Sequence, residues 1–293
     1  MAEKSLKTLM REGIVVMPGV FNGITARLAE EAGFKALYIS GAGLANGVAA
    51  MPDMGLLTMT EVLTLAGYIT GAVKVPCVVD GDTGFGEALN VMRMVEGLER
   101  IGAAGVHIED QEMPKKCGHL SGKRLVTPED MAGKIAAAVE ARKDPEFLII
   151  ARTDARAVEG LDGAIKRAQL YIEAGADCVF PEALESKEEF TVFRNEVNAP
   201  LLANMTEFGK TPLITVKEFE EMGYNLVIFP LTAFRVMLRS VKGAFERLKV
   251  EGTQEGFLGE MFTRDELYEL IGYEGYEEVD RKVAGLFSPG KKR

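Results

Sequence analysis

The chain has 293 residues, 47% of them hydrophobic, and its 44 acidic and 34 basic side chains give a formal net charge of −10. A surface of this sign repels nucleic-acid phosphates, and no apolar run is long enough to cross a bilayer. The first residues lack the apolar segment of a secretion signal, and the three cysteines are widely spaced. We therefore expect a cytoplasmic protein that binds neither nucleic acid nor membrane.

Short apolar runs alternate with longer amphipathic stretches along most of the chain. The runs are continuously apolar, which is typical of strands buried on both faces of a parallel sheet. In chain order, the predicted strands are residues 14–20, 36–41, 77–82, 105–110, 147–154, 178–183, 201–208 and 226–233. The stretches between them carry helix-start signals, such as the capping box of Thr58 and Glu61 and the proline at Pro128.

Eight strands separated by helices predict an α/β fold, a (β/α)8 TIM barrel, over a single domain of residues 1–293. A doubly wound open sheet is the competing architecture. After the eighth strand we expect a helix near residues 234–250 and another at 263–271. The C-terminal extension of about 251–293 exceeds what a barrel needs, and we expect its apolar face to pack on another subunit.

Polar residues end most of the predicted strands. Because the active site of such a barrel lies at the C-terminal ends of its strands, these residues predict a polar cup. The residues at or just past the strand ends are Ser40, Gly41, Asp80, Asp82, Glu109, Asp110, Arg152, Thr153, Asp154, Glu182, Asn204, Thr206, Glu207 and Arg235.

Two carboxylates of the third strand suggest a metal site. Asp80 and Asp82 are two residues apart, so both point to one face of a regular strand. Paired carboxylates before a glycine-rich loop suit Mg²⁺ or Mn²⁺. The alternative is a pair of helix-capping aspartates, and Glu109 on the next strand favours the metal. Zinc is disfavoured, because Cys117 and His119 have no second Cys/His pair.

The segment from His107 to Lys123 contains both histidines of the chain and the motif Lys115-Lys116-Cys117-Gly118-His119. Nearby positive charge lowers the pKa of a thiol, so we expect the lysines to make Cys117 lose its proton more easily. Two histidines close to a cysteine indicate proton-transfer chemistry at this place.

With these motifs the chain resembles the isocitrate lyase/phosphoenolpyruvate mutase superfamily over nearly its full length, and most closely the branch that cleaves 2-methylisocitrate. The resemblance rests on residues 38–41, 52–55, 80–86, 107–111, 115–119, 151–155, 180–183, 204–209 and 263–268. The motif around Cys117 is specific for the lyases, because mutases and decarboxylases of the superfamily replace the cysteine.

The resemblance implies a homotetramer in which the last barrel helix is swapped between subunits. It implies Mg²⁺ at Asp80 and Asp82, with Asp53 and Glu109 in the outer shell. The catalytic residues it implies are Cys117, Tyr38, Arg152 and His107. The substrate contacts it implies are Ser40, Gly41, Ala42, Gly118, Arg152, Glu182, Asn204, Thr206, Arg235 and Arg264.

The implied reaction is a carbon–carbon lyase step of propionate catabolism, which cleaves 2-methylisocitrate to pyruvate and succinate. Tyr38 or a metal-linked water is the candidate base, and Cys117 is the candidate proton donor. The apolar residues near two strand ends, Phe180, Pro181 and 229–231, are expected to accept the methyl group. Alternatives are a phosphonomutase acting on carboxyphosphonoenolpyruvate or phosphoenolpyruvate, an oxaloacetate hydrolase or decarboxylase, a dimethylmalate lyase, and a non-enzymatic carboxylate-binding barrel that needs a metal.

Overall fold

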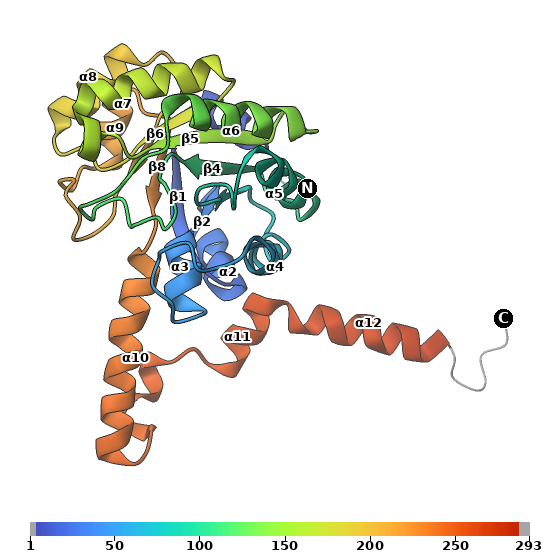
Figure 1. Ribbon diagram of the computed structural model, residues 1–293. Coiled ribbons are helices and arrows are strands. Elements are labelled where there is room, and N and C mark those ends of the chain that lie inside the picture. The colour runs from blue at the N-terminus through green and yellow to red at the C-terminus, as the bar shows by residue number, and fades with distance from the viewer. Residues whose placement is uncertain (1–3, 287–293) are drawn as a thin grey trace. The chain divides into compact units, whose positions relative to one another are not determined.

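The computed structural model describes residues 4–286. These residues form two compact units, of which the first ends at Val236 and the second begins at Met237. Eight parallel strands form the centre of the first unit (Figure 1). The strands are β1 (Val15–Val20), β2 (Leu37–Ile39), β3 (Cys77–Asp80), β4 (Gly105–Glu109), β5 (Leu148–Thr153), β6 (Cys178–Pro181), β7 (Leu202–Asn204) and β8 (Leu226–Phe229).

The strands close into a barrel. Their order is β6-β5-β4-β3-β2-β1-β8-β7, so strands that follow one another in the chain are neighbours and β8 lies beside β1. Between β6 and β7 a parallel bridge joins Val179 to Leu201, and the Val179 amide donates to the carbonyl of Pro200 at 2.9 Å. The predicted (β/α)8 barrel is therefore confirmed, and the open doubly wound sheet is excluded.

All eight predicted strands are present, and the main differences are at the ends of the last two. β7 ends at Asn204 and β8 at Phe229, whereas the predicted strands continued to residues 208 and 233. Phe208 has a φ of 61°, which is far from the strand region. Pro230 has no amide hydrogen for a ladder bond. The predicted strands were too long because apolar residues continue past the ends of both strands into the segments that follow them.

Helices alternate with the strands of the first unit. At the predicted capping box, the Glu61 amide donates to the Thr58 hydroxyl and the Glu61 carboxylate accepts from the Thr58 amide. Pro128 is the first residue of a helix, as predicted. The helices are α1 (Leu6–Glu12), α2 (Gly23–Glu31), α3 (Gly41–Gly47), α4 (Met59–Thr70), α5 (Ala88–Arg100), α6 (Pro128–Ala141), α7 (Arg156–Glu173), α8 (Lys187–Glu196), α9 (Val216–Glu221) and α10 (Thr232–Glu251).

Side chains fill the inside of the barrel. Met17 and Phe180 are fully buried there. Leu6 of α1 belongs to the same apolar cluster as Val15 and Leu226, which lie at the N-terminal ends of β1 and β8. The helix α1 therefore closes the N-terminal end of the barrel with apolar contacts, and the C-terminal ends of the strands remain for the polar site.

The second unit is helical. The predicted helices near 234–250 and 263–271 are both present, the first as α10, which crosses the boundary between the units. The other elements are the 3₁₀ helix η1 (Glu255–Glu260), α11 (Arg264–Ile271) and α12 (Tyr273–Leu286). The single-domain assignment and the packing of this extension on another subunit stay predictions.

No helix in the described part of the chain combines the length and the apolar character that a membrane span requires.

Candidate active site

The predicted polar residues lie on neighbouring strands at the C-terminal end of the barrel. In the register of the sheet, Asp80 of β3 is opposite His107 of β4, and Glu109 of β4 is opposite Arg152 of β5. Glu182 comes directly after β6. These side chains therefore form one continuous group of charges around the end of the barrel.

Asp80 is the centre of the first cluster. Its carboxylate accepts hydrogen bonds from the Tyr38 hydroxyl and the Gly41 amide, both at 3.1 Å, and it lies 3.2 Å from Nε2 of His107. A Cβ on Gly41 would lie 2.7 Å from this carboxylate, so only glycine fits there. Burial opposes ionisation of Asp80, but His107 and more distant cations hold its pKa well below the usual value.

Tyr38 is buried beside this carboxylate. Its hydroxyl also lies 2.8 Å from Nε2 of His107, and the two rings stack with their centroids 5.7 Å apart. Burial, and then the charge of Asp80, raise the pKa of Tyr38 well above its usual value. A phenol of this kind keeps its proton at neutral pH, which disfavours Tyr38 as the general base.

Asp82 and Glu109 form the second cluster. Nζ of Lys115 is 2.7 Å from Oδ1 of Asp82 and also pairs with Asp53. The geometry of the contact with Asp82 is not that of a hydrogen bond, so Oδ1 has no hydrogen-bond partner. Both carboxylate oxygens of Glu109 are likewise buried without one, although Arg152 lies 3.1 Å away. Burial raises the pKa of Asp82 and of Glu109.

These residues fit a hard divalent cation. Buried carboxylate oxygens without hydrogen-bond partners are the donors that Mg²⁺ prefers, and Mg²⁺ typically takes one or two carboxylates while keeping several waters. Within residues 4–286, no three His, Cys, Asp or Glu side chains already converge as a complete ligand set. The unpaired oxygens of Asp82 and Glu109 therefore suit an ion that completes its shell with water or substrate. Both oxygens of Asp80 already accept hydrogen bonds, so its role as a metal ligand stays a prediction.

Cys117 lies on the loop of residues 112–124, which we call the Cys117 loop. Its side chain reaches solvent, but enough protein surrounds it to raise the pKa of the thiol, with the backbone amide of His119 opposing the shift. The prediction that lysines lower this pKa is wrong, because Lys115 binds Asp53 and Lys123 is buried against Asp154. The thiol therefore stays protonated near neutral pH, as a proton donor requires.

Arg152 is the buried cation of the site. Its guanidinium donates to Asp154 at 3.0 and 3.2 Å and lies over the ring of Phe180, 5.2 Å from the centroid. It also lies 3.7 Å from Glu182. Burial opposes ionisation of Glu182, but Arg152 and then His119 lower the pKa of this carboxyl to about 2. The pair therefore stays ionised at neutral pH.

His119 links the Cys117 loop to two other segments. Nε2 of His119 is 2.9 Å from Glu182, and Nδ1 accepts a hydrogen bond from the Lys210 amide at 3.0 Å. A ring that accepts at Nδ1 carries its proton at Nε2. The Nδ2 group of Asn204 donates to the same carboxylate at 3.2 Å. Glu182 thus joins the loop to the ends of β6 and β7.

The other predicted substrate-binding residues lie in different parts of the structure and differ in how buried they are. The Ser40 hydroxyl accepts from the Gly43 amide and caps α3. Arg235 lies 3.3 Å from Glu207 and stacks on Phe208, 5.2 Å from the ring centroid. Arg264 begins α11 in the second unit, where it is exposed, so its contact with substrate stays a prediction. Ala42, Thr206 and Asn204 are half-buried in the first unit.

Comparison with known proteins identifies the family. The chain matches the phosphoenolpyruvate phosphomutase family over residues 6–249. This chain belongs to that family. It is 58% identical over 274 residues to a 2-methylisocitrate lyase of Aeropyrum pernix, a match that covers 94% of this chain and 88% of the relative.

Solved structures of the phosphoenolpyruvate phosphomutase family share the whole fold. A 2,3-dimethylmalate lyase, described as a PEP mutase/isocitrate lyase superfamily member, matches with a TM-score of 0.90 at 36% identity, covering 98% of both chains. A phosphonopyruvate hydrolase in complex with oxalate and Mg²⁺ matches with a TM-score of 0.85 at 31% identity, covering 94% of this chain and 96% of the other. The predicted superfamily membership is confirmed.

Sequence reasoning placed Asp110 and Asp154 among the strand-end residues of the cup and Lys123 near Cys117, but gave none of the three a catalytic, substrate or metal role. Asp110 is fully buried; it accepts from the Asp154 amide and the Thr153 hydroxyl at 2.8 Å and from the Tyr171 hydroxyl at 2.9 Å. Since Asp110 directly follows Glu109, strand alternation already places the two on opposite sides. The alternation of side chains along the strand could therefore have shown from the sequence that Glu109 faces the cup and that Asp110 supports it from the other side.

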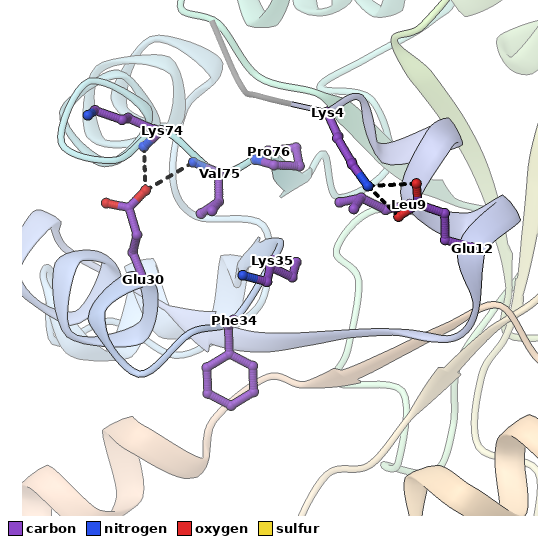
Figure 2. Close-up of a pocket in the computed structure, with 9 residues that line it drawn as sticks. All are labelled: Lys4, Leu9, Glu12, Glu30, Phe34, Lys35, Lys74, Val75 and Pro76. Carbon is purple, nitrogen blue, oxygen red and sulfur yellow. Dashed lines mark hydrogen bonds and ion pairs between the residues drawn. The ribbon is translucent and has the colours of Figure 1, made fainter.

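A separate cavity of about 670 Å³ lies away from these residues (Figure 2). It opens near the N-terminal ends of β2 and β3, the opposite end of the barrel from the cup. Three of its side chains are lysines, and Lys4 pairs with Glu12 at 2.7 Å. No predicted catalytic, substrate or metal residue of this family member lines it. Its lining consists of Lys4, Leu9, Glu12, Glu30, Phe34, Lys35, Lys74, Val75 and Pro76.

Proposed function

We propose that this chain is a Mg²⁺-dependent carbon–carbon lyase that cleaves 2-methylisocitrate to pyruvate and succinate. The observation that carries the proposal is the position of the free thiol of Cys117, on a loop whose next residue, Gly118, lies directly against Arg152 and Glu182. A Cβ on Gly118 would be 2.3 Å from Glu182 and 2.7 Å from Arg152. A proton donor and a buried cation therefore meet in one polar cup. The relatives named 2-methylisocitrate lyase support this substrate.

Asp80 and Asp82 would hold Mg²⁺, or Mn²⁺ in its place, with Asp53 and Glu109 further out. When bound, the ion lowers the pKa of a substrate hydroxyl and draws electrons from the neighbouring carboxylate. The related phosphonopyruvate hydrolase forms a complex with Mg²⁺ together with oxalate, a small dicarboxylate. A divalent cation together with a small dicarboxylate would also suit the side of this cup that carries Asp80, Asp82 and Glu109.

The reaction breaks the bond between the carbon that bears the hydroxyl and its neighbour in the succinate half. The hydroxyl proton passes to water in the cup, the alternative base to Tyr38. The carbon that bore the hydroxyl becomes the carbonyl of pyruvate, and the bonding electrons pass to the succinate half. Arg152 stabilises the negative charge that develops there. Cys117 then gives its proton to the carbanion and completes succinate. Tyr38, which holds its proton, donates a hydrogen bond in the cup rather than removing the hydroxyl proton.

Asn204, Thr206 and Arg235 are proposed to bind the substrate carboxylates, together with the backbone amides near Ser40, Gly41 and Ala42. We also propose that the protein is a cytoplasmic homotetramer of propionate catabolism in which Arg264 and the last barrel helix are shared between subunits. These parts of the proposal follow the resemblance to the lyase branch.

The experiment measures the consumption of each substrate and identifies its products, with and without Mg²⁺. The substrates are 2-methylisocitrate, isocitrate, 2,3-dimethylmalate, oxaloacetate and phosphonopyruvate. We expect the highest kcat/KM for 2-methylisocitrate, with pyruvate and succinate in equal amounts. A higher kcat/KM for phosphonopyruvate or oxaloacetate would overturn the proposal.

A further inference from the structure

Lys123 is a buried lysine that the reaction described above does not use. Its side chain is 1% exposed, and Nζ is 2.7 Å from Oδ1 of Asp154, whose side chain is fully buried. The same ammonium donates a hydrogen bond to the Gly118 carbonyl. Gly122, immediately before it, has a φ of 74°, a backbone conformation that favours glycine. The backbone there turns so that the lysine points inward rather than to solvent.

The contacts of Lys123 connect two parts of the site. Through the Gly118 carbonyl it holds the Cys117 loop next to the reactive thiol. Through Asp154 it reaches Arg152, because the Asp154 carboxylate accepts from both Nε and Nη2 of the guanidinium. Oδ1 of Asp154 is shared between Lys123 and Arg152. Movement of the lysine therefore disturbs both the loop and the arginine.

Asp154, the partner of Lys123 in the barrel, is held firmly in place. The Asp154 amide donates to Asp110 at 2.8 Å, and Asp110 is fixed by Thr153 and by Tyr171 of α7. Buried and fully paired charge networks of this kind hold their members in one arrangement. Asp154 is thus an anchor in the barrel, whereas the Cys117 loop is attached at its base by the bridge between Gln111 and Leu125.

We propose that Lys123 is a positioning residue, which holds Gly118 and Cys117 at the strand ends through its ion pair with Asp154 and keeps Arg152 in its orientation. The part that concerns turnover rests on the proposed lyase function. The part that concerns the loop does not, and it can be measured without substrate.

The test uses the full-length protein and the variants Lys123→Met and Arg124→Met. Arg124 is the matched control, because it is the next cation on the same loop but pairs at the surface with Glu112, with its own side chain 72% exposed. Hydrogen exchange of the amides of residues 116–123 reports the loop. We expect exchange to rise at least about tenfold in Lys123→Met, with no change in the strands or in Arg124→Met.

In the same preparations, kcat for 2-methylisocitrate should fall about 100-fold in Lys123→Met, the loss that a displacement of about 1 Å can cause. The Mg²⁺ concentration needed for half-maximal activity should stay the same, because Asp80 and Asp82 keep their surroundings. Unchanged loop exchange in Lys123→Met would overturn the inference, and so would a loss of kcat without faster exchange. If the unmodified enzyme does not cleave 2-methylisocitrate, only the proposed function fails, and the exchange result still decides the role of Lys123.

A second comparison covers the case in which an unpaired buried carboxylate unfolds the single variant. The double variant Lys123→Met/Asp154→Asn removes both charges. The kcat of the double variant is compared with those of the single variants Lys123→Met and Asp154→Asn. If the two residues act as one unit, the kcat of the double variant is no lower than the lower of the two single-variant values. Losses that multiply would show that they act separately, and would overturn the ion pair as the positioning contact.

Discussion

The two ends of the barrel differ in how completely their buried polar groups are paired. At the C-terminal end of the strands, several buried polar atoms have no hydrogen-bond partner among the described residues. They belong to Asp82, His107, Glu109, His119, Asn204, Glu207 and Arg235. Some of these atoms lie near an opposite charge, but without the geometry of a hydrogen bond. Unsatisfied groups of this kind are costly unless a ligand pairs with them.

The N-terminal end is closed mainly by paired groups. Among the described residues, Oε2 of Glu99 is the one buried polar atom there without a hydrogen-bond partner, and the other oxygen of that carboxylate accepts from the Lys143 and Asp144 amides. Asp177 lies 2.8 Å from Lys7 and 2.5 Å from Arg142, and it accepts from the Ile149 amide at 2.9 Å. The Ser5 hydroxyl donates to Glu146. These contacts connect α1 and the loops before β5 and β6 into one network, which has no evident need for a ligand.

Backbone conformation shows the same difference. Five described residues other than glycine have positive φ: Ala50, Asp82, Phe85, Ala183 and Phe208. All five lie in segments that follow the C-terminal ends of β2, β3, β6 and β7. Such conformations cost free energy and gather at functional sites. The C-terminal end of the barrel therefore contains the strained and unpaired groups that function requires, whereas the N-terminal end stabilises the fold.

The largest effect is expected at the carboxylate pair. Asp80→Ala removes the acceptor of Tyr38 and Gly41 and a proposed Mg²⁺ ligand, so 2-oxo acid release from 2-methylisocitrate should fall below detection. Chelation of the unmodified enzyme should do the same, while its thermal unfolding midpoint falls only modestly, because the barrel core does not depend on the cup. Asp162→Ala, an exposed carboxylate on α7, is the control. Full activity in excess chelator, with no metal found by elemental analysis, would contradict the metal assignment.

The second effect concerns the proton donor. Cys117→Ser should fold normally and bind Mg²⁺ but lose about 10²–10⁴ of kcat, the usual contribution of one acid–base group. Cys77→Ala, at a buried thiol in β3, should keep its turnover. A serine variant with a near-normal rate would remove Cys117 from the mechanism.

The pH profile gives an independent check of the same residue. The donor must be protonated, so activity falls as pH rises through the pKa of Cys117. Because that pKa is raised, the midpoint of the fall should lie above the ordinary thiol value of about 8.5. A fall with its midpoint below about 8.5 that disappears in Cys117→Ser would indicate a lowered thiol pKa, contrary to the geometry.

The strands, the capping boxes and the polar cup could be predicted from the sequence, because they follow from hydrophobic periodicity and from residue types at strand ends. The partners of the lysines could not. Lys115, Lys116 and Lys123 look equivalent around Cys117. In the structure, Lys115 pairs with the half-buried Asp53 and Lys123 with the fully buried Asp154, both on other segments. Only the fold brings Asp53 and Asp154 to these lysines. Only the fold also buries the thiol of Cys117, and this burial raises its pKa.

A smaller effect is expected for substrate choice within the cup. The enzyme should prefer 2-methylisocitrate to isocitrate by about 10–200-fold in kcat/KM, the range that one methyl group can supply. The apolar residues near the ends of β6 and β8, including Phe180 and Leu231, are the expected contacts of that methyl group. Measurement of kcat/KM for both substrates with one preparation decides this, and equal values would contradict the predicted lining.

The smallest effect on turnover is expected at the opposite end of the barrel. Asp177→Asn keeps the shape of the side chain but removes the charge that pairs with Lys7 and Arg142. Since Asp177 is 20% exposed, the free energy of unfolding should fall by about 1–3 kcal/mol. Because the residue lies at the start of β6, far along the strand from Glu182, kcat at a temperature well below unfolding should not change.

The matched control for this variant is Glu221→Gln. Glu221 forms a solvent-exposed pair with Lys217, with side chains 65% and 84% exposed. Pairs of this kind contribute little, so the denaturant midpoint should stay where it is. If Asp177→Asn lowered kcat in proportion to the lost stability while Glu221→Gln did not, the two ends would be energetically coupled. The separation between a stabilising end and a functional end would then be wrong, since a change in the paired network would reach the unpaired carboxylates of the cup.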